Sequence, residues 1–166
     1  MSKVDRNDKT ANSRNRSLGK TILIFFLRFL VASFVLTLLA LKFENSYSEF
    51  IALSADPLLK IFHYNVIMEK AMDIADDISL NPIVFISLVI ATLGVSISKR
   101  IIAGLVGFAI LTAANIITVF FVFLSYYRGS EALWAGSEFL NLTINFFLPI
   151  LLWFALLPTD WGRNMK

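Results

Sequence analysis

The sequence has 166 residues, of which 57% are hydrophobic and 16% are charged. Soluble domains are about 45–50% apolar and about 25% charged, so this composition, with a mean hydropathy of +0.73, is typical of an integral membrane protein. The chain has no cysteine and one histidine, which excludes disulfides, thiolate nucleophiles and clusters of imidazole metal ligands. The net charge of +3 comes from segments that flank apolar runs, so we attribute it to membrane topology and predict no nucleic-acid partner.

The first twenty residues are polar and carry six Lys or Arg side chains against two Asp. They show no apolar periodicity, so residues 1–20 are predicted to form a disordered, basic cytoplasmic tail. The positive charge is interpreted as a topology signal, and a contact with anionic lipid is the alternative.

A first membrane span is predicted over 21–41, because about twenty apolar residues suffice to cross a bilayer core of about 30 Å. Arg28 interrupts this run. Its side chain can extend along the helix toward the cytoplasmic headgroups. The alternative is a partner inside the bundle or on another subunit, which makes Arg28 a candidate contact for a partner or for lipid.

The connection over 43–81 is acidic and poor in Lys and Arg, which places it on the outer side of the membrane. Within it, Asp56 and Pro57 resemble the N-cap and first residue of a helix. An amphipathic extracytoplasmic helix is therefore predicted over about 57–74. His63 would lie on this helix as an exposed or interfacial residue rather than as a ligand.

A helical hairpin is predicted next, with spans over 82–98 and 101–124 joined by a short basic inner turn at Lys99 and Arg100. Two pairs of small residues on the third span are spaced for close helix approach: Ala103 with Gly107, and Ala109 with Ala113.

An outer loop is predicted over 125–138, with Tyr126, Tyr127 and Trp134 as anchors at the membrane interface. The triplet Gly-Ser-Glu occurs twice in this loop, at 129–131 and at 136–138, and both copies are interpreted as turn or helix-start residues.

The last span is predicted over 139–157 with a kink at Pro149, and residues 159–166 return to the cytoplasm. The predicted fold class is an all-α, integral membrane four-helix bundle with one additional extracytoplasmic amphipathic helix. It forms a single domain over 21–158, and both termini are cytoplasmic.

Uncharged polar residues lie inside the predicted spans. Asn115 and Thr118 belong to the third span, and Asn141 and Asn145 are four residues apart on the fourth. These side chains are candidate interhelical contacts, since amides in membrane helices commonly form hydrogen bonds between helices. A substrate or ion path is the other interpretation. It would need ionisable groups at depth, and Arg28 is the one such group in the spans.

The second half of the chain, over 82–158, resembles the exosortase/archaeosortase family of membrane transpeptidases. The resemblance lies in "KRIIAGLVGFAILTAANIITV", a small-residue helix that follows a basic turn and carries Asn115, and in the final span "NFFLPILLWFALLP". The family carries a cysteine nucleophile at the outer start of the span before the basic turn. Here that region reads "DDISLNPIVF" and has no cysteine.

The resemblance also implies an arginine three residues after the helix asparagine, where this chain has Thr118, and a further basic residue for which Arg128 is a possible remnant. Without the thiolate no acyl-enzyme can form. The resemblance therefore implies a non-catalytic relative, and no catalytic residue, cofactor, metal or small-molecule substrate is predicted.

The expected function is that of a non-enzymatic, multi-pass protein of the bacterial inner membrane. It would contact the lipid bilayer and either a membrane-protein partner in an exosortase-type sorting or envelope system or further copies of itself. The alternatives are a structural accessory subunit of a larger respiratory or secretory complex, and a small transporter component.

Overall fold

The structure is a computed structural model that describes residues 3–78 and 80–157, and its secondary structure over these ranges is helical, without strands. In chain order the elements are α1 (Lys3–Ala40), α2 (Glu44–Lys60), α3 (Met68–Ile78), α4 (Leu80–Ala91), α5 (Ile97–Arg128), α6 (Glu131–Leu142), the π-helical segment η1 (Thr143–Phe147) and α7 (Leu148–Leu156). The predicted all-α class is confirmed for these residues. The predicted C-terminal tail over 159–166 lies outside them.

Three helical stretches are long and apolar enough to cross a membrane: Gly19–Ala40, Ile97–Arg128 and Glu131–Leu156. They correspond to the predicted first, third and last spans. The chain therefore has the helices of a membrane protein, as its composition predicts.

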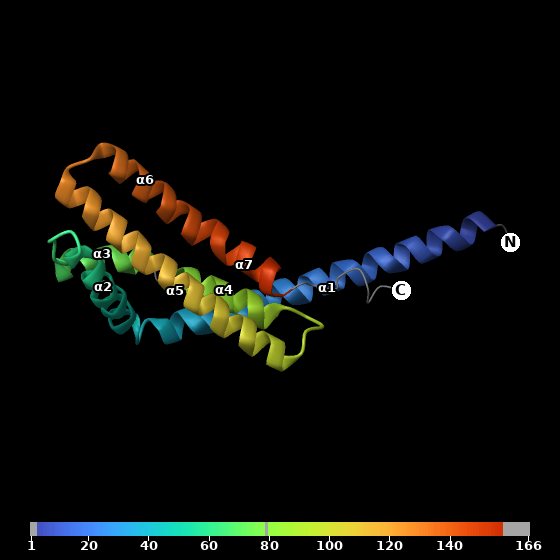
Figure 1. Ribbon diagram of the computed structural model, residues 1–166. Coiled ribbons are helices and arrows are strands. Elements are labelled where there is room, and N and C mark those ends of the chain that lie inside the picture. The colour runs from blue at the N-terminus through green and yellow to red at the C-terminus, as the bar shows by residue number, and fades with distance from the viewer. Residues whose placement is uncertain (1–2, 79, 158–166) are drawn as a thin grey trace.

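The long helices lie side by side, and both the N-terminal part of α1 and the end of α7 lie toward the same end of the bundle (Figure 1). We call this the proximal end; the 92–96 turn between α4 and α5 also lies there. The opposite, distal end carries α2, α3 and the 129–130 turn between α5 and α6 (Figure 1). Helices α1 and α5 thus run from the proximal to the distal end, and α4 and the α6–α7 stretch run in the opposite direction (Figure 1).

Helix α1 extends beyond the predicted first span at its N-terminal side. It begins at Lys3, so residues 3–20, predicted to be a disordered tail, are helical in the structure and project from the bundle (Figure 1). No proline interrupts this segment, and its first glycine is Gly19. A helix that continues from an already formed apolar helix needs no new nucleation, which accounts for the difference.

The second predicted span is shorter than expected. Helix α4 has 12 residues and so measures about 18 Å, less than the bilayer core of about 30 Å. The chain leaves the helix after Ala91 and turns at Gly94, whose φ of +76° favours glycine. Lys99 and Arg100, predicted to form the turn, instead lie at the start of α5.

The predicted amphipathic helix over 57–74 is wrong in its boundaries. Pro57 lies inside α2, and a separate helix, α3, follows a turn. Asp56 does not cap a helix start. Its carboxylate accepts a hydrogen bond from the Val66 backbone N–H at 3.1 Å and pairs with Lys60 at 2.5 Å. His63 lies in the resulting turn, with a φ of +63°.

The buried face of α5 includes residues that recur every three or four positions: Ala103, Gly107, Leu111, Asn115, Thr118 and Val119. The ring of Phe85 from α4 lies directly over Gly107, where an added Cβ would come within 2.1 Å of its Cζ. Gly107 is therefore approached closely by the ring of Phe85, and Ala103 is also buried, whereas a close approach of two helix backbones at this pair stays a prediction. The prediction for Ala109 and Ala113 is wrong, because both are exposed.

The predicted outer loop over 125–138 is mostly helical. Helix α5 continues to Arg128 and ends at Gly129, whose φ is +58°, and Ser130 then caps α6 by accepting the Leu133 N–H at 3.4 Å. The first Gly-Ser-Glu triplet is thus a turn and helix start, as predicted. The second triplet, at 136–138, lies inside α6, contrary to the prediction.

Candidate functional site

Five polar side chains from separate parts of the chain meet at the centre of the bundle. They are Tyr47 of α2, Asn81 of α4, Asn115 of α5, Asn141 of α6 and Asn145 of η1. We call this group the amide cluster. It joins α2, α4 and α5 to the last helical stretch.

Asn81 is the central member of the amide cluster. Its Nδ2 donates to Asn115 Oδ1 at 2.8 Å and to Asn145 Oδ1 at 3.0 Å. Asn115 Nδ2 donates back to Asn81 Oδ1 at 3.3 Å, so the two amides form a reciprocal pair. Asn81 therefore links α5 to η1, a connection that sequence analysis placed directly between the third and fourth spans.

The edges of the cluster lie on α2 and α6. Asn115 Nδ2 also donates to Tyr47 Oη at 3.0 Å, and this hydroxyl lies 3.4 Å from Thr112 Oγ1. At the other edge, Asn145 Nδ2 donates to Asn141 Oδ1 at 2.6 Å. Asn141 and Asn145, four residues apart on the last span, are therefore two of the five members of a larger network.

The wide helical turn of η1 positions Asn145. Pro149 has no N–H to donate to the Asn145 carbonyl four residues earlier, and its ring crowds that carbonyl. The chain responds with a π-helical segment, in which the Leu148 N–H bonds the Thr143 carbonyl, five residues back. Pro149 thus produces a π-helical turn, which relieves the steric conflict that the sequence predicts as a kink.

The two central amides are almost completely buried, with exposed fractions of 1% for Asn81 and 0% for Asn115. A buried amide without a hydrogen-bond partner would cost about 1–3 kcal/mol. The reciprocal pairing removes this cost and makes the burial of each amide depend on the other. The cluster can therefore hold helices in register and accept or donate hydrogen bonds. It contains no carboxylate, thiol, imidazole or amine.

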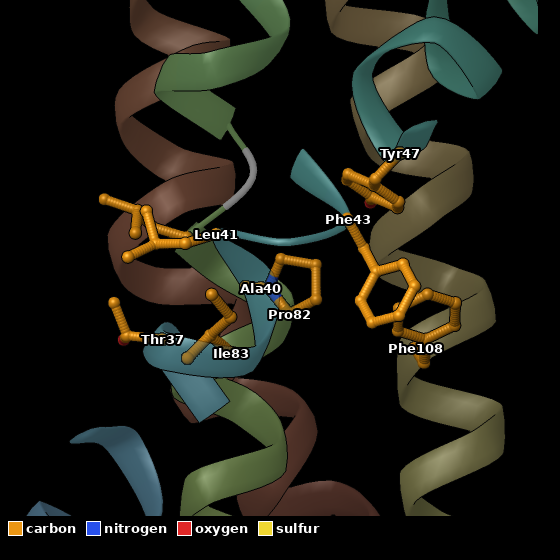
Figure 2. A pocket seen from close by; sticks show the side chains of 9 residues that line it. Thr37, Ala40, Leu41, Phe43, Tyr47, Pro82, Ile83 and Phe108 are labelled. Atoms are coloured by element: carbon orange, nitrogen blue, oxygen red, sulfur yellow. The ribbon is translucent and has the colours of Figure 1, made fainter. Parts of the chain in front are cut away.

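An apolar pocket of about 150 Å³ adjoins the amide cluster. Figure 2 shows it between the end of α1, the start of α2, the start of α4 and the middle of α5. Its lining includes Phe43, Pro82, Ile83 and Phe108, and Tyr47 connects it to the cluster through its hydroxyl. A cavity of this size and polarity can hold a small apolar group but offers it no reactive side chain.

Two predicted site residues of α5 lie outside the network. Thr118 is buried, and its hydroxyl donates to the Ala114 carbonyl of its own helix at 3.0 Å. Arg128 is exposed at the distal end of α5, with its guanidinium 5.7 Å from the centre of the Phe62 ring. It is 13 residues, or about 20 Å of helix, from Asn115.

Arg28 also lies away from the amide cluster. It is exposed on α1, one helical turn after Phe25, whose ring lies 5.7 Å from that of Trp153. Trp153 in turn donates its Nε1–H to Thr92 Oγ1 at 2.7 Å, beside the proximal turn. Arg28 is therefore near the proximal end, and no ion pair involving it is present among the described residues.

Sequence analysis identified three of the five cluster members and missed Asn81 and Tyr47. Both lie in the segment that was assigned to an outer connection. The combination of Asn81 with Pro82 is a usable signal, because it places an amide at the start of an apolar helix. Nothing in the local sequence distinguishes Tyr47 from the other aromatic residues of that segment.

Comparison with known proteins provides no further information on the site, because no family model, curated protein or solved structure matches this chain. Its function must therefore be inferred from the chemistry of the amide cluster and from the surfaces that the bundle leaves uncovered.

Proposed function

We propose that this chain is a non-enzymatic membrane protein that binds another membrane protein in an exosortase-type sorting or envelope system of the bacterial inner membrane. One observation carries the proposal: a neutral amide pair, Asn81 with Asn115, occupies the centre of the bundle. Its groups can stabilise a fold, but they are weak nucleophiles.

The position of this pair supports the resemblance to exosortases. The resemblance expects the nucleophile within "DDISLNPIVF" and an asparagine on the helix after the basic turn. Asn81 belongs to the first segment and Asn115 to the second, and their amides are in contact. The protein would then be a relative in which an amide lies near the position of the reactive group.

The orientation in the membrane is part of the proposal. Lys99 and Arg100 lie at the proximal end, whereas α3, with four acidic residues against one lysine, lies at the distal end. The positive-inside rule then makes the proximal end cytoplasmic. Because the chain has no cysteine, Ser96→Cys and Asn65→Cys can report the two ends separately. A membrane-impermeant maleimide applied to the outside of cells should label only Asn65→Cys, and labelling of Ser96→Cys would reverse the orientation.

The partner is tested by affinity purification of the tagged chain from its native membranes in a mild detergent, followed by mass spectrometry. We expect a cysteine-containing exosortase or one of its sorted substrates to copurify. Recovery of neither class of protein from well-solubilised membranes would contradict the proposal.

A second candidate function, a structural subunit of a larger respiratory or secretory complex, is favoured by the surface of α1. In its apolar window only 6% of the residues are buried, and Arg28 is exposed beside this surface. An adjacent subunit could cover this face and supply an acidic partner for Arg28. Native gels distinguish the two functions: a structural subunit comigrates with a large assembly of fixed composition, and Arg28→Leu should weaken that comigration.

A further inference from the structure

A second pocket, of about 260 Å³, lies at the distal end between α3, α5 and α6. Its lining consists of Lys70, Ile74, Val122, Phe123, Tyr126 and Trp134. Three of these side chains, Ile74, Val122 and Phe123, are apolar, and the other three carry polar groups. We call this site the Lys70 pocket. It is separate from the amide cluster, and its role does not depend on the partner proposed above.

The polar side of the Lys70 pocket combines a cation with two aromatic rings. The Lys70 ammonium lies 3.6 Å from the centre of the Tyr126 ring, a favourable cation–π distance. Tyr126 and Trp134 are 52% and 51% exposed, so both are accessible from outside the bundle. Among the side chains that the structure describes, no carboxylate pairs with Lys70.

These groups match the chemistry of a membrane–water interface. Tyr and Trp favour the depth of the lipid headgroups, where one part of the ring is apolar and another can form hydrogen bonds. A lysine at that depth can bind a lipid phosphate as a point charge. The apolar side chains of the same pocket can then contact the first part of an acyl chain.

The charge around the pocket favours a zwitterionic headgroup over an anionic one. Helix α3 carries four acidic residues and one lysine, and Glu131 lies in the first turn of α6. A headgroup with a net negative charge would be repelled by the net negative charge that the sequence gives α3. A zwitterionic phospholipid carries its own cation, which is attracted by that charge, while its phosphate meets Lys70.

We propose that the Lys70 pocket binds a zwitterionic phospholipid, such as phosphatidylcholine or phosphatidylethanolamine, with its phosphate on Lys70 and its glycerol and upper acyl region against Val122, Phe123 and Trp134. The lipid would connect α3, an amphipathic helix, to the membrane-crossing hairpin of α5 and α6.

The test uses Trp134 as a reporter of the lipid beside it. The full chain is reconstituted into vesicles in which dibrominated phosphatidylcholine, a contact quencher of tryptophan, is titrated into phosphatidylglycerol. The sequence has two other tryptophans, Trp153 and Trp161, so the Trp134 signal is the difference between the wild type and Trp134→Phe. We expect the local ratio of brominated lipid to phosphatidylglycerol to exceed the bulk ratio about five-fold, a factor that corresponds to roughly 1 kcal/mol.

The variants separate binding in the pocket from general contact with lipid. Lys70→Ala should return the Trp134 quenching to the bulk fraction, whereas Lys70→Arg should retain most of the enrichment. Lys60→Ala removes the same charge from the same acidic region, but Lys60 does not line the pocket, so the enrichment should remain. Circular dichroism establishes that each variant is folded.

Two results would overturn the proposal. Quenching that follows the bulk lipid fraction in the wild type would mean that the pocket has no lipid preference. Stronger quenching by brominated phosphatidylglycerol, titrated into phosphatidylcholine, would mean that the pocket selects an anionic lipid.

Discussion

Helices α1 and α5 are both long and apolar, yet they occupy the bundle in different ways. In the most apolar window of each helix, 33% of the residues of α5 are buried, compared with 6% for α1. Helix α5 packs with α2, α4, α6 and α7, and it contributes Asn115 to the amide cluster. Helix α1 packs mainly on α4 and leaves most of its apolar face uncovered.

Hydropathy does not explain this difference, since it identifies both helices as candidate spans. The buried face of α5 is distinguished by small and polar residues, among them Gly107 and Asn115. In lipid, apolar surface has no solvent-driven reason to leave the surroundings, so close packing and hydrogen bonds decide which face is buried. The core of this bundle is therefore identified by its small and polar side chains. Apolar character alone does not identify it, since Phe34 on α1 is as apolar as any core residue.

The largest effect should come from replacing one phenylalanine by alanine in each of the two environments. Phe85 of α4 is 0% exposed and packs on α5, whereas Phe34 of α1 is 66% exposed. Phe85→Ala should cost about 3–5 kcal/mol, because it leaves a cavity against Gly107. Phe34→Ala should change the free energy of unfolding by less than about 0.5 kcal/mol. Unfolding titrations in mixed detergent micelles measure both values, and equal losses would show that α1 is also buried.

The second comparison uses two glycines of α5 that are three residues apart. A Cβ at Gly107 would overlap the fixed ring of Phe85, whereas a Cβ at Gly104 has nothing within 4 Å. Gly107→Ala should therefore destabilise the protein by about 1–3 kcal/mol. Gly104→Ala should be neutral or stabilising by up to about 1 kcal/mol. Thermal unfolding in one detergent provides the comparison, and a stable Gly107→Ala protein would mean that α4 and α5 are further apart.

A smaller effect is expected at the amide cluster. Asn81→Leu and Asn115→Leu each break the same reciprocal pair, so their effects should not add. Hydrogen bonds between membrane helices have coupling energies that average about 0.6 kcal/mol and reach about 1.7 kcal/mol. We expect a coupling energy in the upper part of that range, because both amides are fully buried. The double-mutant cycle is measured by unfolding, and strictly additive losses would exclude the direct contact.

The sequence predicts several parts of this architecture because they depend on local patterns. The apolar runs locate the three long helices, and Asn145, predicted as an interhelical contact, accepts a hydrogen bond from Asn81 of α4. The small residue at Gly107 correctly indicates where α5 is approached closely, by the ring of Phe85.

Other parts depend on contacts between segments that are distant in the sequence. Hydropathy averages over a window, so it does not register that the backbone turns at Gly94 and shortens α4. Asn81 and Tyr47 looked like residues of an acidic connection, because their partner, Asn115, is 34 or 68 positions away. Asp56 followed by Pro57 resembles a helix start when only neighbouring residues are considered. In the structure the Asp56 carboxylate instead accepts a hydrogen bond from the Val66 N–H, across the following turn.

The smallest effect should come from this turn, outside the membrane-crossing helices. The carboxylate of Asp56 accepts hydrogen bonds from Lys60 and from the Val66 N–H. These bonds, first the one from Lys60 and then the one from Val66, lower the pKa of Asp56 below its ordinary value of 3.8. A lowered pKa means that the carboxylate stabilises the folded turn at pH values above 3.8, and that this contribution is lost as the pH falls toward the lower, folded value.

Acidification from pH 6 to pH 3 should therefore speed hydrogen exchange at the Val66 amide of the wild type, relative to the intrinsic exchange rate at each pH. Asp56→Asn should exchange faster at pH 6 and lose most of this acid-dependent change, after correction for the intrinsic exchange rate. An identical acid response in the variant would assign the effect to another carboxylate, and the α2–α3 turn would then be held by the packing of its aromatic residues.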